Sequence, residues 1–438
     1  MIQQTIFPFK LKMTREGLTA YGGLALMAEF NHGIGLRELT DKYLPRPQSN
    51  RGYAPSVFVD TMILMLEGGG RSLEDIRELA YESPLMRIIG REDVPGADAI
   101  GDWLRRMGDK ETGMKGLEGL DKVREGINHR IMKRDGIEEY TLDADATEII
   151  SEKQDARFTY KGNKGYMPNL GFLYENNICL YDEFREGNVS PGYGQAGFYR
   201  ECKKRMPRGK RIGYYRADSA SYQAELINEL EEDGVRWAIT ADQDSAVKAA
   251  IASVGKEGWK EPVAGCGYEV AETVHSMNKT NNAFRLVIKR EKREQGELFH
   301  QTGEHYFYHA IATNWEREDK DNVEVIAWHN QRGEAENFNK ELKNGFGMDR
   351  MPCGQSEANG VFFRIGVLAY NLFVGFKRLS CPASWIQHTI ATVRWKFVHV
   401  AGHIVRHAGS IILKLAVDTE KLELFSRIRW RSYEMSLW

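Results

Sequence analysis

The feature that most constrains the fold of this chain is a change of hydrophobic pattern near Glu138. Up to about residue 135, apolar residues recur at helical spacing, as in LTAYGGLALMAEF and SVFVDTMILMLEG. Beyond it, EEYTLDADATEII alternates between apolar and polar residues, the pattern of a half-buried strand. Two more strand-like runs follow, and strand-like and helix-like runs then alternate up to about residue 240. This order predicts an α/β fold, with helices flanking a mixed sheet, behind a helical N-terminal region.

The rest of the pattern divides the chain further. Residues 241–322 hold short β-like runs separated by polar turns, which we interpret as a β-rich insertion that interrupts the α/β core. Helical patterns near 329–344 and 357–378 then resume the core. We therefore predict a helical region at 1–135, the first part of the core at 136–240, the insertion at 241–322, the second part of the core at 323–380, and a basic C-terminal region at 381–438.

Composition excludes several classes of protein. The net charge is −2, so the chain is not a polycation that simply coats nucleic acid. Its five cysteines are dispersed without a C-x-x-C pair, which argues against a disulfide framework and a zinc ribbon. The first residues lack a signal-peptide pattern, and the apolar run Gly360–Phe376 is interrupted by Arg364 and Asn371. We expect a soluble cytoplasmic protein that does not contact a membrane.

Two acidic residues lie at the ends of predicted strands. Asp145 ends the first strand, and Asp218 ends a later strand just before a helix. Carboxylates at such strand ends converge at one edge of an α/β sheet, where ligands gather. Two alternatives stay open: Asp143 points to the same side as Asp145, and Asp218 has the position of an ordinary helix N-cap.

A third acidic residue lies on the helix predicted near 329–344. At about 100° per residue, Glu336, Lys343 and His329 fall within about 60° of Arg332. A carboxylate flanked by cations along one face suits a site where the acid binds metal and the cations bind phosphates. The alternative is an ion pair within the helix, between Glu336 and Arg332 or Lys340.

The spacing Arg332-x3-Glu336-x6-Lys343 resembles the Tyr-x2-Arg-x3-Glu-x6-Lys signature of the DDE transposases of bacterial cut-and-paste insertion sequences, with His329 in the tyrosine position. Asp145 precedes a small residue and Thr147, as the first aspartate of that family does, and Asp218 has the context of the second. The resemblance covers roughly residues 138 to 380.

The resemblance implies an RNase H-like core in which Asp145, Asp218 and Glu336 are catalytic and hold two Mg²⁺ or Mn²⁺ ions. It also implies an endonuclease that cleaves DNA at the ends of an element and transfers the 3′ strands into target DNA. The implied partners are the terminal inverted repeats, target DNA and a second copy of the chain in a synaptic complex. The implied place is the bacterial cytoplasm at the nucleoid, and the helical region 1–135 is expected to contact DNA. The alternatives are an RNase H-like nuclease or resolvase without strand transfer, and a domesticated DNA-binding protein.

Further residues are candidates for contacts with DNA. On the glutamate helix, we expect His329, Arg332, Lys340 and Lys343 to bind phosphates. A basic run before the Asp218 strand is either a solvated face or a surface for the DNA backbone; it comprises Arg200, Lys203, Lys204, Arg205, Arg208, Lys210 and Arg211. Trp259 in the insertion either packs in the core or stacks on a flipped base.

Overall fold

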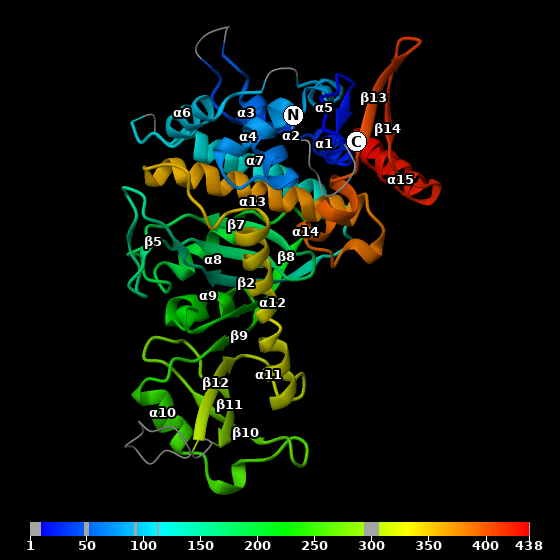
Figure 1. Ribbon diagram of the computed structural model, residues 1–438. Coiled ribbons are helices and arrows are strands. Elements are labelled where there is room, and N and C mark those ends of the chain that lie inside the picture. Colours follow the sequence, from blue (N-terminus) through cyan, green and yellow to red (C-terminus); the bar gives the residue numbers. More distant parts are fainter. Residues whose placement is uncertain (1–9, 48–51, 92–93, 112–113, 293–305, 438) are drawn as a thin grey trace.

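The protein is a layered α/β structure in the computed structural model, which describes residues 10–47, 52–91, 94–111, 114–292 and 306–437. The first layer consists of N-terminal helices (Figure 1). These are α1 (Leu24–Gly33), α2 (Leu36–Tyr43), α3 (Pro55–Gly68), α4 (Ile76–Tyr81), α5 (Ser83–Ile88), α6 (Ala97–Met107) and α7 (Lys115–Met132). The expected helical N-terminal region is therefore confirmed.

Helix α13 (Ser356–Leu379) lies between these helices and the central sheet (Figure 1). It contacts α3, α6 and α7 on one side and the sheet on the other. By length and composition α13 could cross a membrane, but 94% of its most apolar window is buried inside the protein. We therefore interpret it as the core helix that joins the two layers.

Among the described residues, eight strands form one mixed sheet. In spatial order they are β10 (Tyr268–His275), β11 (Phe284–Lys292), β12 (Tyr306–Thr313), β9 (Arg236–Thr240), β8 (Arg211–Ala217), β2 (Glu139–Ala146), β6 (Asn169–Leu173) and β7 (Ile178–Glu183). The pairs β2–β8 and β8–β9 are parallel, and the other neighbouring pairs are antiparallel. This mixed sheet confirms the predicted fold class. Because β12 pairs with β9, the strands of the expected insertion extend the same sheet.

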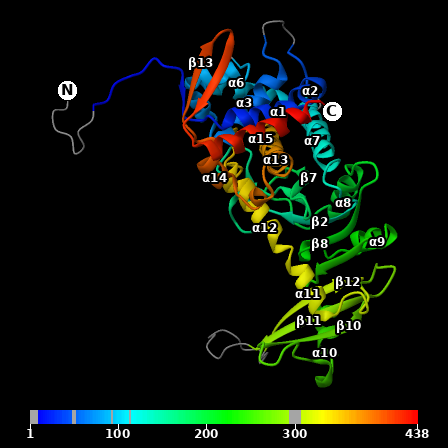
Figure 2. The same cartoon turned by 90° about the vertical axis from the view of Figure 1, so that its right-hand side faces the viewer.

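Helices cover the two faces of the sheet. On one face lie α8 (Gln195–Lys204), α9 (Ala224–Glu232) and α10 (Ser245–Ala252). On the opposite face, α11 (Asn322–Asn330) and α12 (Gly333–Lys340) run past the strand ends (Figure 2). Val325 and Ile326 of α11 are buried against Val270, Val287 and Ile311 of the sheet, and this apolar contact fixes α11 on it.

Smaller elements complete the chain. A three-stranded sheet of β3 (Ile149–Ile150), β5 (Lys164–Tyr166) and β4 (Arg157–Phe158) follows β2. A second sheet pairs β1 (Leu18–Thr19) with the hairpin of β13 (Gly402–His407) and β14 (Ser410–Leu415). Helices α14 (Ile390–Val393) and α15 (Thr419–Met435) lie in the C-terminal region, and α15 packs on α1.

A buried ion pair links two central strands to α11. The guanidinium of Arg216 on β8 donates to both oxygens of Asp143 on β2, each at 2.8 Å, and both side chains are fully buried. Arg216 also donates to the Trp328 carbonyl at 2.9 Å and to Gln331 Oε1 at 3.2 Å, at the end of α11. One side chain therefore holds β2, β8 and the end of α11 together.

The continuous helix predicted near 329–344 is wrong. The chain forms α11, a turn at Gln331 and Arg332, α12, and a turn of π-helix at Glu341–Gly345. In a continuous helix the Trp328 carbonyl would accept from the Arg332 amide. Here Arg216 donates to that carbonyl, and the Arg332 amide donates to the His329 carbonyl instead. The break therefore arises from a long-range contact that local periodicity does not show.

Replacing Arg216 tests the weight of this ion pair. Arg216→Met leaves the Asp143 carboxylate buried without its partner, so we expect the free energy of unfolding to fall by about 3–5 kcal/mol. The matched control is Arg211→Met on the same strand, because Arg211 is 62% exposed and its pair with Glu139 contributes less than about 1 kcal/mol. Urea titration measures both variants, and equal losses would contradict this account.

Candidate active site

Asp145 and Asp218 meet at one edge of the sheet. Strands β2 and β8 are parallel neighbours, with Asp143 opposite Arg216 and Ala144 opposite Ala217. The next residues along are Asp145, the penultimate residue of β2, and Asp218, which directly follows β8. Neighbouring strands lie about 4.8 Å apart, so the backbones of the two aspartates are adjacent. The structure thus brings the two predicted strand-end carboxylates together.

The choice between Asp143 and Asp145 now has a structural answer. Asp143 is 0% exposed, and both of its carboxylate oxygens accept hydrogen bonds from Arg216, so it holds β2 and β8 together. Asp145 lies two residues further along the same face, and its side chain is 15% exposed at the strand end. Of the two, Asp145 is the one that a ligand can reach.

The third acid, Glu336, lies beside the same arginine, Arg332, as Asp145. Arg332 Nη1 is 3.7 Å from Asp145 Oδ1, and Arg332 Nη2 is 3.8 Å from Glu336 Oε1. The Glu336 side chain is 67% exposed at the start of α12. The alternative pairing of Glu336 with Arg332 is therefore present. The Arg332 guanidinium thus lies beside both Asp145 and Glu336, through different nitrogens.

Side chains further along the helix complete the edge. Asn339 on α12 donates from Nδ2 to Asp145 Oδ2 at 2.6 Å, which fixes the orientation of that carboxylate. Lys343 in the π-helical turn donates to Thr147 Oγ1 at 3.3 Å and to the Glu148 carbonyl at 2.8 Å. The helix stripe that carries Arg332 and Lys343 thus faces the end of β2. Lys340 is exposed on α12.

Burial and electrostatic repulsion raise the pKa of Asp145. Burial is the largest cause, and the neighbouring charge of Asp218 is the next; together with Glu336 they raise the pKa to about 6, against the opposing pull of Arg332. Two further carboxylates therefore lie close enough to Asp145 to disfavour its charge. A cation bound among these oxygens would relieve that repulsion.

The donor set fits a hard divalent ion. Asp145 uses Oδ2 for Asn339, and Asp218 uses Oδ1 to accept from the Ala220 amide at 3.0 Å. Within the described part of the chain, each aspartate thus keeps one oxygen without a hydrogen bond, and such oxygens suit Mg²⁺ or Mn²⁺. No three acidic, histidine or cysteine side chains of the described residues already converge as a metal-binding group. The Arg332 guanidinium lies between two of the carboxylates, so binding an ion requires it to move.

His329, which we expected to contact phosphate, does not face this edge in the structure. Its side chain is buried, and Nε2 lies 3.2 Å from both the Ala217 carbonyl and Thr240 Oγ1. Burial lowers the pKa of the imidazole to about 4, so the ring is neutral at physiological pH. His329 therefore fastens α11 to β8 one residue before Asp218. The break in the helix turned it away from the stripe.

The basic run before β8 lies away from the site. Arg211 begins β8 and Asp218 follows its end, seven residues or about 23 Å along the strand. Arg205 and Lys210 are largely buried in ion pairs with Asp121 and Asp135. Others also pair with acids: Lys203 with Asp233, Lys204 with Glu201 and Arg211 with Glu139. Arg208 is exposed. Closeness in sequence to Asp218 was thus no guide to closeness in space.

Trp259 lies away from Asp145 and Asp218. Its side chain is 8% exposed and is covered by Arg290, whose guanidinium carbon lies 4.0 Å from the ring centroid. Trp259 therefore packs in the core, which was one of the two expectations for it.

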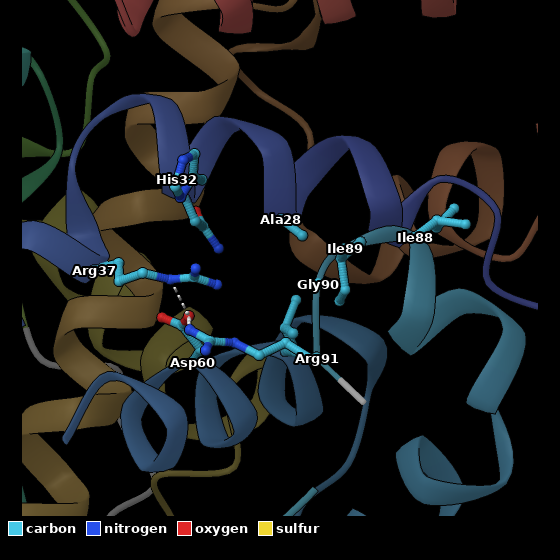
Figure 3. Close-up of a pocket in the computed structure, with 10 residues that line it drawn as sticks. Ala28, His32, Arg37, Asp60, Ile88, Ile89, Gly90 and Arg91 are labelled. Carbon is cyan, nitrogen blue, oxygen red and sulfur yellow. Dashed lines mark hydrogen bonds and ion pairs between the residues drawn. The ribbon is translucent and has the colours of Figure 1, made fainter. Parts of the chain in front are cut away.

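A cavity of about 330 Å³ lies among the N-terminal helices (Figure 3). Arg37 and Arg91 share Asp60 on its polar side, so cations outnumber carboxylates there, unlike at a metal site.

Sequence reasoning missed Asn339 and Arg216. Asn339 falls on the same helical stripe as Arg332 and Glu336, but an uncharged amide gave no electrostatic signal. Arg216 stands in the motif Arg-Ala-Asp before Asp218, yet nothing local shows that it pairs with Asp143. The position of Asn339 could have been predicted from its spacing along the helix, whereas the partner of Arg216 depends on which strands are neighbours in the sheet.

Comparison with known proteins identifies the family of the chain. The family model described as Transposase DDE domain group 1 matches residues 7–431. The chain belongs to this family of DNA transposases. A solved structure of piggyBac transposase, in a synaptic complex with hairpin DNA, is similar to this transposase at 12% identity. The similarity covers 87% of this chain and 81% of that chain, with a TM-score of 0.48. A search of curated proteins gave no match.

The raised pKa of Asp145 predicts a pH-dependent metal response of the transposase. A divalent ion binds the deprotonated carboxylate, so stabilisation by Mn²⁺ is present above the pKa and is lost as pH falls through about 6. We expect Mn²⁺ to raise the melting temperature at about pH 7.5 and to have little effect at about pH 5. Thermal melting of wild type and Asp145→Asn measures this. An equal Mn²⁺ effect in both proteins would contradict the assignment.

Proposed function

We propose that this transposase cleaves DNA at the ends of a mobile element and joins the freed 3′ ends to target DNA, with Asp145, Asp218 and Glu336 holding two Mg²⁺ or Mn²⁺ ions. One observation carries the proposal: Asp145 and Asp218 meet at the ends of parallel strands, and Glu336 reaches from α12 the Arg332 guanidinium that also lies beside Asp145. Carboxylates brought near one another from separate elements provide the negative charge that binds the metal ions of DNA cleavage.

The bound ions would supply activation of a water or 3′ hydroxyl and stabilisation of the leaving oxygen. The chain supplies orientation. Asn339 holds the Asp145 carboxylate, the Ala220 amide holds that of Asp218, and Glu336 is free to turn inward because it is exposed. Attack by water on the phosphodiester would release a 3′ hydroxyl and leave a 5′ phosphate, and attack by that 3′ hydroxyl on a target phosphate would form a new phosphodiester and release a 3′ hydroxyl of the target strand. The same carboxylates therefore serve cleavage and strand transfer.

Cations on the same edge are suited to hold the DNA backbone. With ions bound to the carboxylates, the Arg332 guanidinium would no longer be needed beside Asp145 and could bind a phosphate. Lys343 lies at the end of β2, and exposed Lys340 lies between Lys343 and Glu336 in sequence. We propose that these three side chains bind the phosphates beside the scissile bond.

The remaining partners follow from the reaction proposed. An element has two ends, so we propose that two copies of the chain assemble with both terminal inverted repeats and the target DNA. The helical region 1–135 is the proposed DNA-binding part, and the proposed place of action is the bacterial cytoplasm at the nucleoid. The substrate is thus duplex DNA held by a dimer.

A cleavage assay on DNA that carries the element's own ends tests the proposal. With Mg²⁺ or Mn²⁺, we expect wild type to nick at the end and to join the 3′ end to target. Glu336→Gln should bind the DNA but lose activity by about two orders of magnitude or more, because one metal-binding carboxylate is gone. Glu334→Gln is the matched control, since Glu334 is exposed on the same helix and lies on its far side.

The outcomes separate the alternatives. A wild type that nicks a duplex end but does not join a pre-cut end is a nuclease or resolvase. A wild type that binds the ends without cleaving them under any metal condition is a domesticated DNA-binding protein. Equal activity of Glu336→Gln and Glu334→Gln would show that Glu336 is not a ligand.

A further inference from the structure

An eight-residue segment beside the site combines cations and aromatic rings. It reads RFTYKGNK from Arg157 to Lys164, contains three cations and two aromatic residues, and has no acidic residue. It begins with β4, turns at Gly162, where φ is +83°, and ends at the start of β5. The turn therefore presents a basic and aromatic surface.

Both rings of this segment are open to solvent. Phe158 is 69% exposed and Tyr160 is 66% exposed. Thr159 between them is buried, and the Gly162 amide donates to the Thr159 carbonyl at 2.9 Å, so Tyr160 lies in the turn that directly follows Phe158. Lys161 Nζ lies 5.5 Å from the centre of the Tyr160 ring. Trp259, by contrast, has its ring covered by Arg290.

Hydrogen bonds connect this segment to the sheet edge where Asp145 and Asp218 lie. The Thr159 hydroxyl donates to the Glu148 carboxylate, and Asn163 Nδ2 donates to Glu148 Oε1 at 3.3 Å. The Glu148 carbonyl in turn accepts from Lys343 Nζ at 2.8 Å. Both Asp145 and Lys161 are among the charges that act on the pKa of Lys343, which burial lowers. The rings thus stand on a turn anchored three residues beyond Asp145.

We propose that Phe158 and Tyr160 form a stacking platform for unpaired DNA bases at the mouth of the site, with Lys161 and Lys164 binding the phosphates of that strand. The inference rests on the proposed function for its ligand. Intact duplex DNA offers cations its phosphates but hides the base faces in the stack, so exposed rings add affinity only for a strand whose bases are unpaired. Interleaved cations supply the charge complementarity that a single strand needs.

Binding to single and double strands tests the platform. Fluorescence anisotropy compares full-length wild type with Phe158→Ala/Tyr160→Ala, using a labelled oligothymidine of about 12 nucleotides and a duplex of equal length. We expect the double variant to lose about 5- to 150-fold in affinity for oligothymidine for each ring that stacks, and much less for the duplex. Phe158→Trp/Tyr160→Phe, which keeps both rings, should retain the affinity.

A matched control and a folding check complete the design. Trp430→Ala removes a ring that is 61% exposed on α15, and it should leave oligothymidine binding unchanged. Thermal melting should show the double variant folded like wild type, because both rings are exposed. Unchanged affinity for oligothymidine, or an equal loss for single and double strands, would overturn the proposal. So would a double variant that alters only self-association in light scattering, which would make the surface a protein interface.

This outcome is separate from that of the proposed function. If wild type binds oligothymidine through the two rings but cleaves no DNA end, the platform stands and the catalytic proposal fails. If wild type cleaves and joins ends while the double variant binds oligothymidine as tightly as wild type, the catalytic proposal stands and the platform fails.

Discussion

The three carboxylate-bearing elements depend on the buried guanidinium of Arg216. It pairs with Asp143 on the strand that carries Asp145, it stands two residues before Asp218 on its own strand, and it binds the Trp328 carbonyl at the end of α11. Because Arg216 and Asp143 are both fully buried, losing either leaves an uncompensated charge. The same contact lies where α11 ends, just before α12 begins. A single side chain thus couples the stability of the sheet to the geometry of the site.

At the sheet edge that carries Asp145 and Asp218, carboxylates repel one another and the Arg332 guanidinium partly offsets that repulsion. Burial and the neighbouring carboxylates of Asp218 and Glu336 raise the pKa of Asp145 to about 6, and the positive charge of Arg332 opposes this rise. In the proposed mechanism, bound ions would take the place of the Arg332 guanidinium beside Asp145, and this guanidinium could then bind a phosphate of the DNA. Glu336, exposed on the first turn of α12, would have to rotate inward to join them.

The sequence predicted the layers, the mixed sheet and the meeting of Asp145 and Asp218, because period-2 alternation and strand-end position are local signals. It did not predict the break before α12, since the cause is Arg216, more than a hundred residues earlier in the chain. That break also explains why His329, correctly spaced for a continuous helix, is buried against β8 instead. The basic run near Arg205 lies away from the site, because a strand carries the chain across the sheet before it reaches Asp218, and its contact with the DNA backbone stays a prediction.

Crystallography with Mn²⁺, read by anomalous scattering, tests the central claim most directly. The account predicts manganese bound by Asp145 and Asp218, with Glu336 turned inward and the Arg332 guanidinium displaced from between the two acids that it now contacts. Crystals of Asp145→Asn soaked in the same way should show no such peak. Wild-type crystals in which Arg332 still separates Asp145 from Glu336, with no manganese at this edge under saturating Mn²⁺, would contradict the account.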